Sequence, residues 1–99
     1  MASTNFRALI NRVAPDLKAA GLSALYLFGS QARGEAREDS DIDLAFDVDP
    51  DCRKFSLLDQ AGLQLRLEQL LGRSVDFIER DAMRPRMRAR VENEMVRLL

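Results

Sequence analysis

Three aspartates have the spacing of a carboxylate cluster that could bind hard metal ions. Asp41 and Asp43 are separated by one residue, and a third acid, Asp76, lies in a later apolar run. Residues i and i+2 of a strand project from the same face about 6.5–7 Å apart, so the first two carboxylates can converge. Asp76 can join them if its strand is a neighbour. Two carboxylates about 4 Å apart repel by roughly 4 kcal/mol at an effective dielectric constant near 20, so such a cluster needs a proton, basic side chains or a cation.

Ligation by oxygen alone favours Mg²⁺ or Mn²⁺ over Zn²⁺. A pair of these ions can hold the attacking and leaving oxygens of a phosphoryl or nucleotidyl transfer, and such a site needs no His. The alternative is that Asp41 and Asp43 form only the solvated face of an edge strand, because an Asp-X-Asp motif alone is weak.

A second motif, Gly29-Ser30, follows the apolar run Ala24 to Phe28. Glycine lets the backbone approach a ligand closely, and the amides that open a helix can hold phosphate oxygens, with the Ser hydroxyl as a further donor. A phosphate cradle and a metal site belong together in phosphate chemistry. The alternatives are an ordinary turn glycine at Gly29 and a helix cap at Ser30.

The composition excludes several other kinds of site. The chain has 99 residues, which predicts a single domain over residues 1–99, with 46% hydrophobic and 31% charged residues. It contains no His, which removes Ser-His-Asp triads and His-ligated zinc sites. Its single cysteine, Cys52, excludes a disulfide framework, and the N-terminus does not resemble a secretion signal. We therefore expect a cytoplasmic protein.

The net charge of −1 conceals two blocks of opposite sign. Residues 35–51 contain eight acidic residues against one Arg, and residues 80–99 contain six Arg against three acidic residues. The arginines of the last segment suit a solvated helix face or a partner-docking surface better than a nucleic-acid site, because no aromatic residue lies among them to stack on bases. Direct binding of nucleic acid is not expected.

The hydrophobic pattern predicts alternating helices and strands. Residues 5–14 have helical spacing, Pro15 is expected to break that helix, and residues 16–20 may be read as one further turn. The terminal helix is expected to carry Met87, Val91, Met95 and Leu98 on one stripe. The other elements are strands over 24–28, 41–48 and 74–78, a turn or short helix over 29–34, and helices over 55–71 and from 82 onward. This order predicts an α/β (α+β) domain, with a small mixed sheet of three to four strands covered by helices.

Two segments together carry a family resemblance. They are Leu27-Phe28-Gly29-Ser30-Gln31-Ala32-Arg33-Gly34-Glu35-Ala36 and Asp39-Ser40-Asp41-Ile42-Asp43-Leu44, followed by the lone acid in Val75-Asp76-Phe77. The chain resembles the minimal nucleotidyltransferase domains of the DNA polymerase β superfamily, from about residue 24 to residue 78. The resemblance implies a nucleotidyltransferase-like fold.

The same resemblance implies roles for these residues. Gly29 and Ser30 would hold the triphosphate of ATP, Asp41 and Asp43 would bind two Mg²⁺ ions, and Asp76 would bind the catalytic ion and help to activate the acceptor hydroxyl. Arg33 would contact phosphate or the scaffold, or would instead pair with Glu35 or Asp39.

Minimal members of this superfamily resemble antitoxins that transfer AMP to a Tyr hydroxyl of a helical HEPN-type toxin. The resemblance therefore implies a Mg²⁺-dependent protein adenylyltransferase that forms a hetero-oligomer with such a toxin. Two alternatives stay open. The chain could neutralise its toxin by stoichiometric binding, or it could be a subunit of a small-molecule nucleotidyltransferase.

Overall fold

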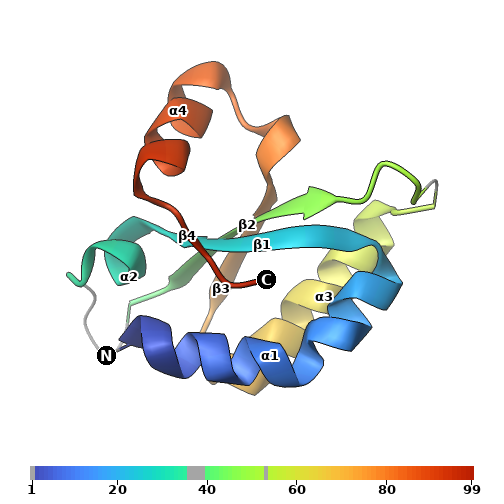
Figure 1. Cartoon of the computed structure of the whole chain (residues 1–99), viewed down its shortest axis with the longest axis horizontal. Coiled ribbons are helices and arrows are strands. Elements are labelled where there is room, and N and C mark those ends of the chain that lie inside the picture. The colour runs from blue at the N-terminus through green and yellow to red at the C-terminus, as the bar shows by residue number, and fades with distance from the viewer. Residues whose placement is uncertain (1, 36–39, 53) are drawn as a thin grey trace.

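The computed structural model describes residues 2–35, 40–52 and 54–99, in which helices and strands alternate (Figure 1). The helices are α1 (Ala2–Ala20), α2 (Gly29–Arg33), α3 (Leu57–Leu71) and α4 (Pro85–Glu94), with a short 3-10 helix, η1 (Arg80–Ala82). The strands are β1 (Leu22–Phe28), β2 (Ile42–Val48), β3 (Val75–Glu79) and β4 (Val96–Arg97). The expected α/β fold with a small mixed sheet is confirmed.

The strands form one sheet in the order β3-β2-β1-β4. β1 is antiparallel to both of its neighbours, whereas β2 and β3 are parallel and are connected through α3. Helices α1 and α3 cover one face of the sheet and α4 lies over the other (Figure 1). The three residues Phe28, Asp43 and Asp76 are register partners across β1, β2 and β3, so the sheet places two predicted site residues side by side.

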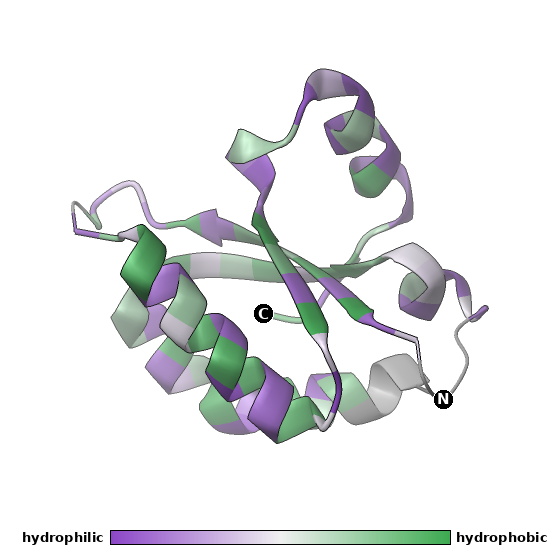
Figure 2. Cartoon of the chain, turned by 180° about the vertical axis from the view of Figure 1, so that it is seen from behind, coloured by the Kyte–Doolittle hydropathy of each residue, from purple (hydrophilic) through white to green (hydrophobic). Residues whose placement is uncertain are grey.

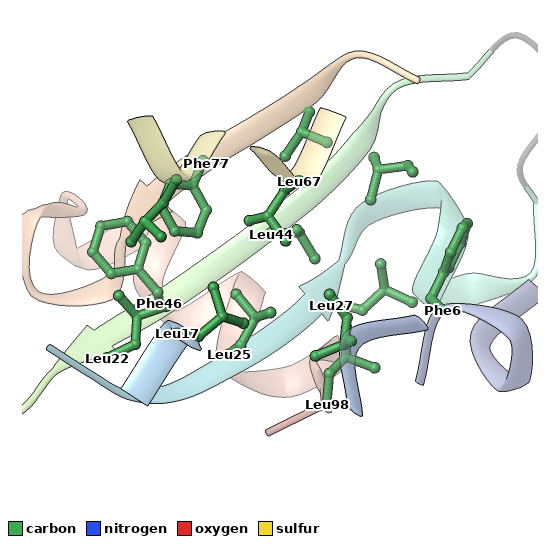
Figure 3. Packing of buried hydrophobic residues seen from close by; sticks show 14 residues of the cluster. Phe6, Leu17, Leu22, Leu25, Leu27, Leu44, Phe46, Leu67, Phe77 and Leu98 are labelled. Carbon is green, nitrogen blue, oxygen red and sulfur yellow. The ribbon is translucent and has the colours of Figure 1, made fainter. Parts of the chain in front are cut away.

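The face covered by α1 and α3 holds the larger hydrophobic core (Figure 3). The alternate residues Ile42, Leu44 and Phe46 of β2 are fully buried there, as the sequence pattern predicts. The rings of Phe46 and Phe77 stack with their centroids 4.2 Å apart, which joins β2 to β3. This core fixes the register of β2, and register decides which face of the sheet Asp43 occupies.

The opposite face holds a smaller cluster beneath α4. Val91 of α4 is fully buried against a cluster drawn from β1, β2 and the residue after η1, namely Ala24, Tyr26, Phe28, Ala45 and Met83. Asp43 belongs to this face, because it lies two residues before Ala45 on β2. Helix α4 and the predicted site therefore share one side of the sheet.

An ion-pair network holds the start of the α4 segment on that face. The Arg80 guanidinium donates two hydrogen bonds of 2.9 Å to the two carboxylate oxygens of Asp47, and the Tyr26 hydroxyl donates to Asp47 at 3.0 Å. Arg80 also lies 5.2 Å from the centroid of the Tyr26 ring and 3.1 Å from Glu92. Burial, and then the hydrogen bond to Asp47, raise the pKa of Tyr26. Tyr26 is thus a core residue, as its sequence context suggests.

The prediction that Pro15 breaks the first helix is wrong. α1 continues through Pro15 to Ala20. Proline removes one backbone donor from the helix, but Pro15 is exposed, while Ile10 and Leu17 on the opposite side are almost fully buried. Burial of Leu17 in the core outweighs the local cost of the proline.

The prediction of one terminal stripe is wrong at its end. α4 stops at Glu94, because Met95 takes an extended conformation and β4 pairs with β1. Met87 and Met95 pack against the smaller cluster, whereas Leu98 is buried in the larger core on the other face. Pairing with a strand edge and burial of Leu98 override the helical spacing.

Helix α3 exposes several large apolar side chains. Leu57, Leu58 and Leu65 are 83%, 84% and 60% exposed, while Leu63 and Leu67 face the core. The ribbon of α3 accordingly alternates between hydrophobic and hydrophilic residues in Figure 2. Across the described ranges, we find no helix with the length and apolar content of a membrane span.

Side chains of α3 hydrogen-bond to the backbone groups along the outer edge of β3. Gln60 and Gln64 donate from Nε2 to the carbonyl oxygens of Phe77 and Val75, at 3.0 and 2.9 Å, and Glu68 accepts from the Val75 amide at 2.9 Å. These α3 residues are spaced four apart, so they lie along one side of the helix. They take the place of a neighbouring strand, which protects an edge that could otherwise pair with another chain.

Replacing Gln64 by alanine is expected to lower the free energy of unfolding by about 1–2 kcal/mol, because the buried carbonyl of Val75 loses its donor. Gln69→Ala is a matched control in the same helix, since Gln69 is exposed. Urea unfolding of both variants measures the difference. Equal stability of the two variants would show that the Gln64 contact contributes nothing.

Candidate active site

Asp43 and Asp76 meet on the face of the sheet that α4 shares. They are direct register partners in the parallel pair β2 and β3, and their carboxyl groups hydrogen-bond to each other. Such a bond requires one of the two groups to carry a proton. Asp41 precedes β2, is exposed, and adds a further negative charge to the same region.

This crowding raises the pKa of Asp43 to about 6. Partial burial contributes most, followed by the hydrogen bond to Asp76 and by the charges of Asp76 and Asp41, while the more distant Arg33 opposes the shift. A carboxyl group that keeps its proton because it is partly buried beside other acidic groups is suited to a hard cation, which would replace that proton.

Helix α2 begins directly against this carboxyl pair. Gly29 has a φ of +72°, and a Cβ built on it would overlap Oδ2 of Asp43 and lie 3.0 Å from its Cγ. The backbone of Gly29 thus approaches Asp43 as closely as only glycine allows. Gly34 ends α2 in the left-handed conformation, which is the ordinary role of a glycine at the end of a helix.

Ser30 does not cap α2. The residue at the N-cap position is Phe28, which makes no side-chain hydrogen bond to the helix, and Ser30 lies inside the first turn. The helix-cap alternative for Ser30 is therefore wrong. Its place in the first turn puts Ser30 among the residues whose amides open α2, and a hydroxyl there could donate to the same ligand.

Arg33 forms ion pairs within the chain. Its guanidinium lies 3.1 Å from Glu35 and 2.6 Å from Glu94 of α4, so the predicted pairing with Glu35 is confirmed. These bonds raise the pKa of Arg33. The alternative partner Asp39 lies outside the described residues. Arg33 therefore links α2 to α4. Nothing in the sequence predicted that Glu94 would be its partner.

The residues that could hold a metal are Asp41, Asp43 and Asp76. Among the residues that the structure describes, no three potential ligands are gathered closely enough to enclose an ion. The arrangement nevertheless fits a hard cation, because Asp43 and Asp76 are register partners on neighbouring strands, and the charges of Asp76 and Asp41 both raise the pKa of Asp43. The donors are all oxygens, which suits Mg²⁺.

The raised pKa of Asp43 predicts a pH dependence of stability without divalent cations. The folded state binds its extra proton between pH 3.8 and about 6. The stabilisation is complete below that range and is lost as the pH rises through about 6. After allowance for solvent screening, we expect a loss of about 1 kcal/mol between pH 4.5 and 7.

Urea unfolding with a chelator, at several pH values, measures this loss. Asp43→Asn should flatten the pH dependence relative to the native sequence, because the amide does not titrate. An unchanged slope in that variant would assign the pH dependence to other groups.

Comparison with known proteins places this chain in a family. The sequence profile of the nucleotidyltransferase domain matches residues 10–98. The protein adenylyltransferase MntA of Thermococcus cleftensis is 36% identical over 78 residues, which cover 77% of this chain and 74% of that protein. A solved structure described as a candidate minimal nucleotidyltransferase is 40% identical, with a TM-score of 0.81, and the match covers 97% of this chain and 95% of that one.

The fold is also similar to a chain in the complex of a tri-AMPylated HEPN toxin of Shewanella oneidensis with an MNT antitoxin. That chain has a TM-score of 0.68 and 20% identity, and the match covers 95% of this chain and 71% of that chain. At this identity the likeness concerns the fold alone. The family match and the 40% identity establish more, namely that this chain belongs to the nucleotidyltransferase domain family and is a nucleotidyltransferase of the minimal type.

Proposed function

We propose that this nucleotidyltransferase transfers AMP from ATP to a hydroxyl group, that of a Tyr, on a HEPN-type toxin, and so acts as the antitoxin of the pair. The observation that carries the proposal is the close approach of Gly29 to Asp43, which is itself hydrogen-bonded to Asp76. This approach sets a backbone suited to phosphate against carboxylates suited to a cation.

Each site residue has a role in this proposal. Gly29 and Ser30 hold the triphosphate, while Asp41 and Asp43 hold two Mg²⁺ ions and Asp76 holds one of them. When bound, Mg²⁺ neutralises the charge that develops on the phosphate oxygens. Arg33 stays committed to Glu35 and Glu94, and acts on the scaffold that positions α2.

The transfer exchanges one phosphorus–oxygen bond for another. The oxygen of the acceptor hydroxyl forms a bond to the α-phosphorus of ATP, and the bond from that phosphorus to the bridging oxygen of pyrophosphate breaks. Pyrophosphate leaves, and the hydroxyl proton passes to the Asp76 carboxylate, which is exposed and can release it to water.

Two relatives support the nature of the acceptor. MntA of Thermococcus cleftensis is a protein adenylyltransferase, and the Shewanella oneidensis complex contains an AMPylated HEPN toxin.

Incubation with ATP labelled at the α-phosphate, Mg²⁺ and the HEPN-type protein encoded by an adjacent gene tests the proposal. We expect label on the toxin with the native chain, and little or none with Asp41→Asn. Asp51→Asn is the matched control, because Asp51 is exposed, acidic and outside the site. It should transfer label normally.

Three outcomes would contradict parts of the proposal. Label transfer that survives Asp41→Asn would overturn the site assignment. Toxin neutralisation that survives Asp41→Asn without any label would favour stoichiometric binding. Nucleotide transfer to a small molecule, with no protein present, would favour a small-molecule nucleotidyltransferase.

A further inference from the structure

Four of the arginines around α4 divide into two groups. Arg80 and Arg88 are satisfied within the chain, since Arg80 pairs with Asp47 and Glu92, and Arg88 pairs with Asp81 and Glu92. Arg86 and Arg90 are exposed and form no ion pair with any residue that the structure describes. We call these two residues the arginine ridge.

The arginine ridge is unfavourable for the helix that carries it. Its two residues are four apart, and like charges at that spacing repel each other on a helix surface. Basic residues also lie at the N-terminal end of α4 and Glu94 lies in its last turn, which is the reverse of what the helix dipole favours. Glu94 is explained by its contact with Arg33, whereas no ion pair within the described residues neutralises Arg86 or Arg90.

The ridge lies on the same side of α4 as Glu94, which contacts α2. Arg86, Arg90 and Glu94 follow one another at intervals of four residues, so they share one side of the helix. Glu94 lies 2.6 Å from Arg33 on α2, and α2 begins at Gly29, against Asp43. At 1.5 Å per residue, Arg90 and Arg86 lie about 6 and 12 Å along the α4 axis from Glu94.

We propose that the arginine ridge docks an acidic segment of the protein that receives AMP. The inference rests on the proposed transfer to a protein and specifies the chemistry of that partner. A segment with Asp or Glu residues near its acceptor hydroxyl pairs with Arg86 and Arg90, while the hydroxyl reaches toward Asp76. Charge complementarity of this kind chiefly orients the partner and speeds its association.

A protein segment fits the ridge better than RNA does. Single-stranded nucleic acid is held by basic residues together with aromatic side chains that stack on bases, and α4 contains no aromatic residue. The acidic residues Glu92 and Glu94 share the helix with the ridge, which would repel a continuous phosphate backbone.

Random copolymers of Glu and Tyr, and of Lys and Tyr, provide acidic and basic probes with the same acceptor hydroxyl. Binding of the fluorescently labelled copolymers to the full chain is measured by anisotropy, without nucleotide. We expect the native chain to bind the Glu copolymer and not the Lys copolymer. The double variant Arg86→Glu with Arg90→Glu should weaken that binding about tenfold or more, and the difference should shrink as salt rises.

The matched control is Arg7→Glu with Arg12→Glu, which makes the same change of charge on exposed residues of α1. It should bind the Glu copolymer within about twofold of the native chain. Equal weakening in both double variants, or none in the ridge variant, would overturn the proposal. So would a single-stranded RNA that binds the ridge more tightly than the Glu copolymer does, or a ridge variant that has lost affinity for ATP.

Transfer is measured separately, with labelled ATP, Mg²⁺ and the Glu copolymer. A ridge variant that needs a higher acceptor concentration but reaches the native maximal rate would support docking by the ridge. Ridge-dependent binding without any transfer, to copolymer or to toxin, would contradict the proposed function and leave the docking proposal standing. If the native chain transfers AMP and the ridge variant transfers it equally well at every acceptor concentration, the proposed function stands and the docking proposal is contradicted.

Discussion

Asp43→Asn is expected to reduce AMP transfer by about 10³-fold or more, which corresponds to roughly 4 kcal/mol of transition-state stabilisation. The amide keeps the shape of the side chain and can still hydrogen-bond to Asp76, but it removes the charge at the most crowded carboxyl of the site. The same change should raise the free energy of unfolding by about 1 kcal/mol at pH 7, after allowance for solvent screening, because the repulsion among the acids is relieved. Label transfer and urea unfolding measure the two effects.

Asp47→Asn should give the opposite pair of results. Asp47 lies on the same strand and the same face as Asp43, but it accepts two hydrogen bonds from Arg80 and one from Tyr26. Loss of its charge weakens this network and should cost about 2 kcal/mol of stability, with transfer largely retained. If Asp43→Asn destabilised the fold, or if Asp47→Asn abolished transfer, the assignment of Asp43 to transfer and of Asp47 to stability would be wrong.

The contrast between these two aspartates shows what could be predicted from the sequence and what could not. The alternation of β2 places Asp41, Asp43 and Asp47 on one face, and the motif with Gly29 and Ser30 points to the first two. The pattern could not show that Asp47 is neutralised, because its partner Arg80 is distant along the chain and reaches it only through the parallel pairing of β2 with β3.

Other differences arise where tertiary contacts override local signals. Pro15 is a helix breaker by local rules, yet burial of Leu17 carries α1 past it. Gln31 lies in the segment predicted as a turn or short helix, where the sequence does not indicate burial, yet it is 4% exposed, and its Nε2 has no hydrogen-bond partner among the described residues. The spacing of apolar residues predicts the type of each element. The continuation of α1 and the burial of Gln31 depend instead on which elements pack together in the fold.

Gly29→Ala is expected to reduce both transfer and stability. A Cβ at this position overlaps Oδ2 of Asp43, and the φ of +72° is itself unfavourable for alanine. Strain and overpacking together should cost about 3 kcal/mol of unfolding free energy. Transfer should fall about 10²-fold or more, because relief of the overlap moves either α2 or the Asp43 carboxylate, and a small misplacement is costly for catalysis. Urea unfolding and label transfer measure these effects.

Gly34→Ala separates backbone strain from the overlap with Asp43. Gly34 has nearly the same φ, +73°, at the other end of α2, but a Cβ there has nothing within 4 Å. Gly34→Ala should therefore lower the unfolding free energy by only about 1 kcal/mol and leave transfer nearly unchanged. The loss of unfolding free energy caused by Gly29→Ala should also be smaller in an Asp43→Ala background, where the overlapping oxygen is gone. Equal costs at Gly29 and Gly34, or additivity of Gly29→Ala with Asp43→Ala, would mean that close approach to the carboxylate does not explain the glycine.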